Sequence, residues 1–112
     1  MAKQRYITEM GMGIDVHGRG YTEAAERAVF DAIQHSSLGF FKAAKKSPHD
    51  MIIEVLIGVP EPDAVDKEIV AKALPYGSVT VKTEKGGLEI PYEDGDDAIV
   101  IANAGILVHF DD

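Results

Sequence analysis

Residues 5–17 alternate between two kinds of side chain with a period of two, which predicts a β-strand. The even positions carry the larger apolar residues, Tyr6, Thr8, Met10, Met12, Ile14 and Val16. The odd positions carry Ile7, Glu9, Gly11, Gly13, Asp15 and His17. Because side chains alternate between the two faces of a sheet, we expect one buried apolar face and a second face of unusual composition.

The next segment has helical spacing. Thr22 is a plausible N-cap, and apolar residues recur every three or four positions up to about His35, with Gly39 as a candidate stop. This inner face consists of Ala25, Ala28, Val29, Ala32 and Ile33. Its alanines would let the helix approach a sheet closely.

The rest of the chain predicts three more strands and a second helix. Residues 40–50 form a loop with one helical turn, and the strands cover Met51–Val59, Ser78–Glu84 and Ala98–Phe110. A bend or a bulge is expected near Ala104 and Gly105 in the last strand. The second helix is capped by Asp63, continues to Leu74 and is stopped by Pro75.

The predicted order is β-α-β-α-β-β, an α/β sandwich with a mixed four-stranded sheet and both helices on one face. This order resembles the arrangement shared by chorismate mutase of the Bacillus type and the C-terminal domain of the tubulin group. A ferredoxin-like relative is also compatible with it. The length of 112 residues suits a single domain, residues 1–112.

Composition and charge narrow the possible functions. The chain contains no cysteine, which excludes disulfides, thiolate metal sites and a cysteine nucleophile. Its formal charge of −8 disfavours nucleic acid and anionic membranes as partners. The acidic excess is C-terminal, and residues 93–97 within it are interpreted as a solvated turn, because they lack the ligand spacing of a calcium loop. No secretory signal or membrane-spanning stretch is recognisable, so we expect a cytoplasmic protein.

The segment Gly11–Gly18 is the most unusual part of the sequence. Glycine inside a strand is unfavourable, so Gly11 and Gly13 on one face suggest that a ligand, a helix or a neighbouring subunit approaches the backbone. Asp15 and His17 would project from the same face, where the strand enters the loop that begins at Gly18.

These residues resemble a family of small conserved hypothetical proteins, found in bacteria and plants, that carries the motif GxGxDxHG. Gly11, Gly13, Asp15, His17 and Gly18 match every specified position. The end of the first helix, residues 34–37, is also similar to the family, and the resemblance covers essentially the whole chain. It implies no particular reaction, because no activity is assigned to the family.

Two nucleotide-binding patterns are excluded. A dinucleotide fingerprint would need glycine at position 16, which is Val16, and no helix begins at Gly13. The phosphate-loop pattern is absent as well.

A histidine beside a carboxylate suits acid–base chemistry, so Asp15 and His17 are the candidate catalytic pair. A ligand site without turnover and a purely structural contact remain open. A metal site would need a third ligand, for which Glu9, His35 and His109 are candidates, but no spacing selects one of them. No metal or cofactor is therefore assigned.

Arg19 and the start of the first helix could together bind an anion. We therefore expect a small enzyme that acts on an anionic or polar metabolite, with Gly11, Gly13 and Gly18 giving backbone access. Glu9 and His35 are further candidates for ligand contact. A chain this short would build its site between the subunits of a symmetric oligomer such as a trimer. The alternative is a non-catalytic ligand-binding, regulatory or assembly module.

Overall fold

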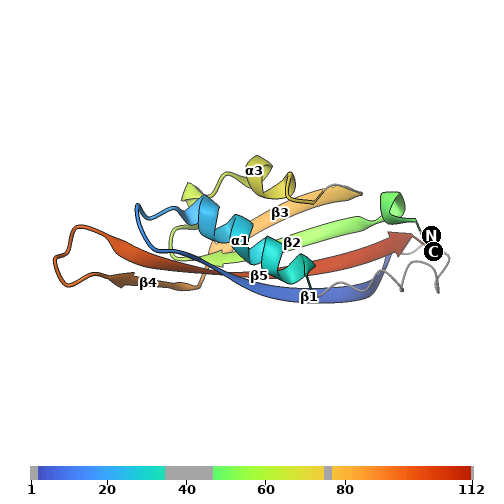
Figure 1. The fold of residues 1–112 in the computed structure, drawn as a ribbon. Helices are drawn as coiled ribbons and strands as arrows, with labels where there is room; N and C mark the ends of the chain where they lie inside the picture. The colour runs from blue at the N-terminus through green and yellow to red at the C-terminus, as the bar shows by residue number, and fades with distance from the viewer. Residues whose placement is uncertain (1–2, 35–46, 75–76, 112) are drawn as a thin grey trace.

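The computed structural model describes residues 3–34, 47–74 and 77–111. Its strands are β1 (Lys3–Asp15), β2 (Ile52–Val59), β3 (Ser78–Lys85), β4 (Leu88–Pro91) and β5 (Ala98–Asp111) (Figure 1). Its helices are α1 (Tyr21–Ile33) and α3 (Lys67–Ala71), and short 3₁₀ turns occur at η1 (Pro48–Asp50) and η2 (Pro62–Ala64).

The five strands form one mixed sheet in the order β1-β5-β2-β3, with β4 also paired to β5. β1, β2 and β4 are antiparallel to β5, whereas β2 and β3 are parallel. The parallel pair follows from the crossover through α3, which returns the chain to the same end of the sheet. Both helices lie on one face, as expected (Figure 1).

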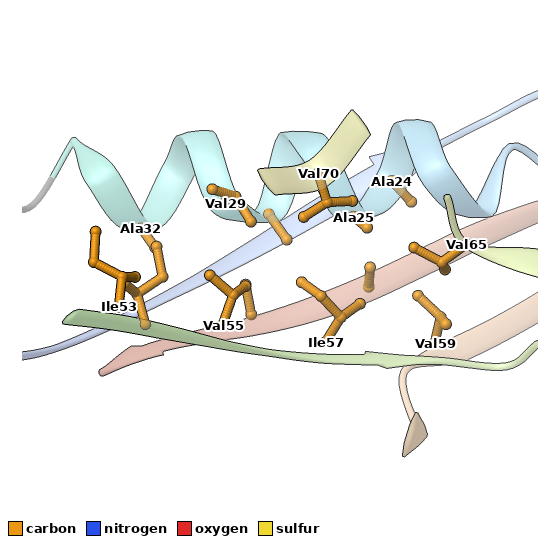
Figure 2. Close-up of a cluster of buried hydrophobic side chains, with 14 of the residues drawn as sticks. Ala24, Ala25, Val29, Ala32, Ile53, Val55, Ile57, Val59, Val65 and Val70 are labelled. Carbon is orange, nitrogen blue, oxygen red and sulfur yellow. The ribbon is translucent and has the colours of Figure 1, made fainter. Parts of the chain in front are cut away.

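The core lies between this face and the helices (Figure 2). The alanines of α1 are fully buried, and the strands contribute mainly β-branched residues, which suit a pleated surface covered from one side. The central members are Ala24, Ala25, Ala28, Val29, Ala32, Val55, Ile57, Val59, Val70 and Val100. The predicted elements are therefore confirmed, with β4 as an additional strand.

Both predicted helix caps are wrong. α1 has Gly20 as its N-cap, and Thr22 lies inside the helix, where its hydroxyl accepts a hydrogen bond from the Asp66 N–H at 2.9 Å. The second helix is capped by the Asp66 carboxylate instead of Asp63. Extended backbone at Val65 separates the η2 turn from α3, so a helix cannot run continuously from Asp63.

β5 has no bulge at the expected position. The pairing of β5 with β1 continues without a shift through Ala104 and Gly105, and the register changes instead between Arg5 and Ile7 in β1. The loop predicted over residues 40–50 is described from residue 47 onward, where the η1 turn forms. His35, Gly39 and Pro75 lie outside the described residues.

The buried and exposed faces of β1 are the reverse of those expected. Met10 and Met12 are 73% and 52% exposed, whereas Gly13 and Asp15 are buried. The glycine-bearing face is the one that α1 covers. A backbone without side chains allows a helix to approach more closely than a row of methionines would, and this close approach decides which face is buried.

Candidate functional site

The glycines of β1 form the seat of helix α1. A Cβ atom at Gly11 would collide with the backbone of Ala28 and Ala32, and one at Gly13 would collide with the backbone of Ala24 and Ala28. We expected a ligand, a helix or a neighbouring subunit to approach these glycines, and the structure shows that it is the helix. The prediction that Gly11 and Gly13 give a ligand access to the backbone on this face is wrong, because α1 fills the space.

Asp15 is a buried joint between β1 and α1. Its side chain accepts a hydrogen bond from Nη1 of Arg27 and another from the Gly20 N–H, both at 2.9 Å. Gly20 precedes the first turn of α1, so the carboxylate lies at the positive end of the helix. The helix N-terminus, where we expected a substrate anion, therefore already holds an anion of the chain itself.

Asp15 and His17 do not pair, contrary to the prediction. β1 ends at Asp15, and the backbone then turns through positive φ angles of 83° at Gly18 and 48° at Arg19. The strand alternation therefore does not extend to His17. Nδ1 of His17 lies instead 3.3 Å from Oδ2 of Asp97, a residue at the start of β5.

Asp97 bonds both to the loop that follows β1 and to the first residue of β5. Besides its contact with His17, it accepts hydrogen bonds from the Gly18 N–H at 2.9 Å and the Ala98 N–H at 2.8 Å. These bonds lower the pKa of the Asp97 carboxyl below its ordinary value, with the Ala98 and Gly18 N–H groups as the largest causes and His17 as a smaller one. Asp97 is therefore a carboxylate at neutral pH.

His17 itself remains open to solvent. Its side chain is 78% exposed, and its ring lies 6.0 Å from the ring of Tyr92, measured between centroids. The Tyr92 hydroxyl donates to the Val16 carbonyl at 2.8 Å, which fixes the aromatic ring beside the loop. His17, Tyr92 and Asp97 line an open hollow of about 640 Å³, together with Glu93 and Asp94.

Arg19 has a partner within the chain. Its Nε donates to Glu89 in β4 at 3.2 Å, and the Tyr21 hydroxyl donates to the other carboxylate oxygen of Glu89 at 2.5 Å. The bond from Tyr21 is the main cause of the lowered pKa of Glu89, and it also raises the pKa of Tyr21 to about 12. Because Glu89 balances the guanidinium, Arg19 is not the free anion anchor that we predicted.

The remaining predicted residues contribute little to this cluster. Glu9 precedes Asp15 by six strand residues, or about 20 Å of extended chain, so it lies far from the His17 loop. His35 falls in the part of the chain that the structure does not describe. Gly18 contributes through its N–H and its positive φ angle. Across the described ranges, no three His, Asp or Glu side chains are grouped so as to hold a metal ion, and no helix is long and apolar enough to span a bilayer.

Sequence reasoning missed Asp97, which belongs to the acidic segment 93–97 that we interpreted as a solvated turn, and Tyr92, which directly precedes that segment. Asp15 pairs with Val100, so the antiparallel pairing of β1 with β5 brings the start of β5 to the end of β1. The hydrophobic pattern of either strand alone does not predict this register. The one available signal was the position of Asp97 directly before a strand, where a short acidic side chain commonly binds nearby backbone N–H groups.

The architecture defines a class of small α/β proteins in which one sheet face carries two helices. A solved structure of this class, an FtsZ-like protein of unknown function from Nostoc punctiforme, is 43% identical to this chain, with a TM-score of 0.88 and coverage of 100% of this chain and 99% of that one. Its description agrees with the expected likeness to the C-terminal domain of the tubulin group.

Residues 5–108 match the model of a family described as "Conserved hypothetical protein (Lin0512_fam)", and the chain belongs to this family. The resemblance inferred from the GxGxDxHG residues is thereby confirmed at the level of the family. No curated protein matches the chain. These comparisons assign the family and the fold, and they assign no reaction.

Proposed function

We propose that His17 and Asp97 form an acid–base pair that acts on a small polar metabolite in the hollow beside Tyr92. The supporting observation is the exposed His17 ring, which contacts the Asp97 carboxylate at Nδ1. Within the described residues Nε2 has no hydrogen-bond partner, so this atom is free to meet a substrate.

The pair supports proton transfer in a simple way. The Asp97 carboxylate accepts a hydrogen bond from Nδ1–H of the neutral imidazole, which leaves the lone pair of Nε2 available as a base. When Nε2 takes a proton from a substrate, the adjacent carboxylate stabilises the imidazolium. The same Nε2–H can then return the proton as an acid. No covalent intermediate is needed.

The charges around the hollow favour a neutral or cationic substrate. Glu93, Asp94 and Asp97 all line it, and Arg19 is already paired with Glu89. An anion would meet three carboxylates and no free guanidinium, so the expected preference for anionic metabolites is replaced by a preference for amines or uncharged polar compounds. Tyr92 offers an aromatic surface that suits either class.

A hydrogen–deuterium exchange assay tests the catalytic proposal. The protein is incubated in D₂O with a panel of amines and uncharged polar carbonyl compounds, and proton NMR follows exchange at their C–H bonds. We expect catalysed exchange for at least one compound, with His17→Ala slowing it about a hundredfold or more. His49→Ala removes the same side chain outside the hollow and should leave exchange unchanged.

The tautomer of His17 provides a test that needs no substrate. Nitrogen-15 NMR should find Nδ1 protonated and Nε2 unprotonated in the neutral ring, and Asp97→Asn should shift this balance. A ring protonated mainly at Nε2 would contradict the proposed base. Loss of exchange without a change in tautomer would assign Asp97 a structural role only.

Binding without turnover is the second candidate. Asp97 bonds to two backbone N–H groups, and Tyr92 bonds to the Val16 carbonyl, so both residues also hold the loop in place. Such a rigid loop can bind a ligand without reacting with it. A compound that shifts the NMR signals of His17 and Tyr92 but shows no exchange in the assay would support this candidate over catalysis.

A further inference from the structure

The sheet face opposite the helices carries apolar side chains that no described segment covers. Strand pairing places Met10 beside Gly105 and Leu56 beside Gly105 on the other side, so these three residues lie in one row across the sheet. A second row joins Ile14, Ile101 and Leu88. The exposed apolar side chains on this face are Met10, Met12, Ile14, Leu88 and Ile90. Exposed apolar patches on this scale commonly mark interaction surfaces.

Gly105 forms a hole in this face. A Cβ atom at this position would meet nothing within 4 Å, in contrast to Gly11 and Gly13, whose missing side chains make room for α1. Glycine inside a strand is unfavourable by about 0.5–1 kcal/mol relative to alanine. The described part of the chain therefore gives no packing reason for this glycine. A hollow of about 490 Å³ lies over it, between Met10 and Leu56.

The face thus carries projecting side chains and a hole side by side. Met10 projects next to Gly105. In two copies related by a twofold rotation, Met10 of each copy can therefore lie over Gly105 of the other. An isologous interface needs this kind of self-complementarity, in which residue i meets j and j meets i. Two sheets packed face to face at about 10 Å leave room for side chains of this size.

The charge on this face also suits a second copy. The chain has a net charge of −8, yet by strand register this face carries three bases, Lys3, Arg5 and Lys82, against three acids, Glu54, Glu84 and Asp111. Lys82 and Glu54 already pair at 3.6 Å. Because the face is balanced, two identical faces can meet without the repulsion that the rest of this acidic surface would produce.

The available area matches what a stable dimer needs. The five strands contain 47 residues. At a strand spacing of about 4.8 Å and a rise of about 3.4 Å per residue, they present roughly 750 Å² of flat sheet. A standard interface buries about 800 Å² on each partner.

We propose that two copies of this chain associate through the helix-free sheet face, with Met10 of each copy packed over Gly105 of the other. This association does not rest on the proposed chemistry at His17, because the hollow beside Tyr92 and the hollow over Gly105 have no lining residue in common.

Light scattering coupled to size-exclusion chromatography tests the association. The wild-type chain should show twice the monomer mass of 12.1 kDa. Met10→Lys should raise the dissociation constant by roughly thirtyfold or more, because it places a charge in the interface core. Phe30→Lys is the matched control, since Phe30 is 62% exposed on α1, on the opposite side of the sheet. It should leave the dimer intact.

Both lysines reduce the net negative charge, so weaker association in Met10→Lys could not be attributed to increased overall repulsion. Gly105→Gln gives an independent check, because a Cβ atom at this position meets nothing within 4 Å and the longer side chain would extend into the hollow over the sheet. Circular dichroism verifies that each variant is folded. A monomeric or trimeric wild type, a dimer that survives both Met10→Lys and Gly105→Gln, or a dimer that Phe30→Lys breaks equally would overturn the proposal.

Discussion

The motif that spans Gly11–Gly18 divides into two parts with different physical roles. In the segment Gly11–Asp15, the backbone lies against α1 and Asp15 is only 8% exposed. In the second part, His17 and Gly18, the imidazole ring and a backbone N–H reach from an exposed loop to Asp97, the residue directly before β5. The first segment serves packing, and the second presents polar groups to solvent. A compact sequence motif therefore need not be a single site, and stability measurements should separate its two parts.

The largest effect is expected at the glycine seat. Gly13→Ala places a methyl group against backbone atoms of Ala24 and Ala28, which cannot move without shifting the helix. We expect a loss of about 3 kcal/mol in the free energy of unfolding, measured by urea denaturation. Gly105→Ala is the same substitution at an open position and should leave the free energy of unfolding unchanged or raise it by up to about 1 kcal/mol. Equal losses at the two glycines would show that helix contact is not the cause.

A smaller loss is expected at the joint between β1 and α1. Asp15→Ala leaves the Gly20 N–H and the Arg27 guanidinium without their acceptor, and we expect a loss of about 2 kcal/mol. Asp15→Asn keeps an oxygen for one of the two donors and should recover about half of that loss. Urea denaturation of both variants measures the difference. An alanine variant as stable as the wild type would remove Asp15 from the packed segment.

The contact between Tyr21 and Glu89 should contribute less and should depend on pH. The pKa of Tyr21 is raised from 10.0 to about 12, which means that the folded state favours the protonated hydroxyl. Its stabilisation is complete below pH 10 and is lost as the pH rises toward 12. Ultraviolet titration should therefore show a late step that is absent in Tyr21→Phe and retained in Tyr92→Phe. We expect Tyr21→Phe to cost about 1 kcal/mol at neutral pH. A Tyr21→Phe chain that keeps the late step would contradict the assignment.

The smallest effect on stability is expected at His17. Its side chain is largely in solvent, so His17→Ala should change the free energy of unfolding by less than about 0.5 kcal/mol. Thermal and urea unfolding measure this directly. A loss comparable to that of Asp15→Ala would place His17 with the packing segment and weaken the case for an active imidazole.

Much of the fold could be predicted from periodicity. Four strands, two helices, their order and the placement of both helices on one face agree with the structure. β4 was missed because four residues after a glycine turn carry almost no periodic signal. Asp63 was predicted as the cap of the second helix because sequence alone does not reveal the extended backbone at Val65.

The site was harder to predict because its partners are distant in sequence. Asp97 lies 80 positions after His17, and only the pairing of β1 with β5 brings the two together. The buried face of β1 was inverted for a related reason. Hydrophobicity favoured the methionines, but the close approach of α1 required the glycines, and that requirement depends on a helix whose position the strand pattern does not contain.

The seat of α1 on β1 has a mechanical consequence. Alternate strand residues are about 6.8 Å apart, and helix residues four apart are separated by about 6 Å, so the two repeats nearly coincide. The helix backbone at Ala24, Ala28 and Ala32 therefore packs against Gly11 and Gly13 in one fixed register. A shift of α1 along β1 by less than one repeat would bring peptide groups of the two elements into collision. We therefore expect α1 and β1 to open to solvent as one cooperative unit, with amide protons that exchange together.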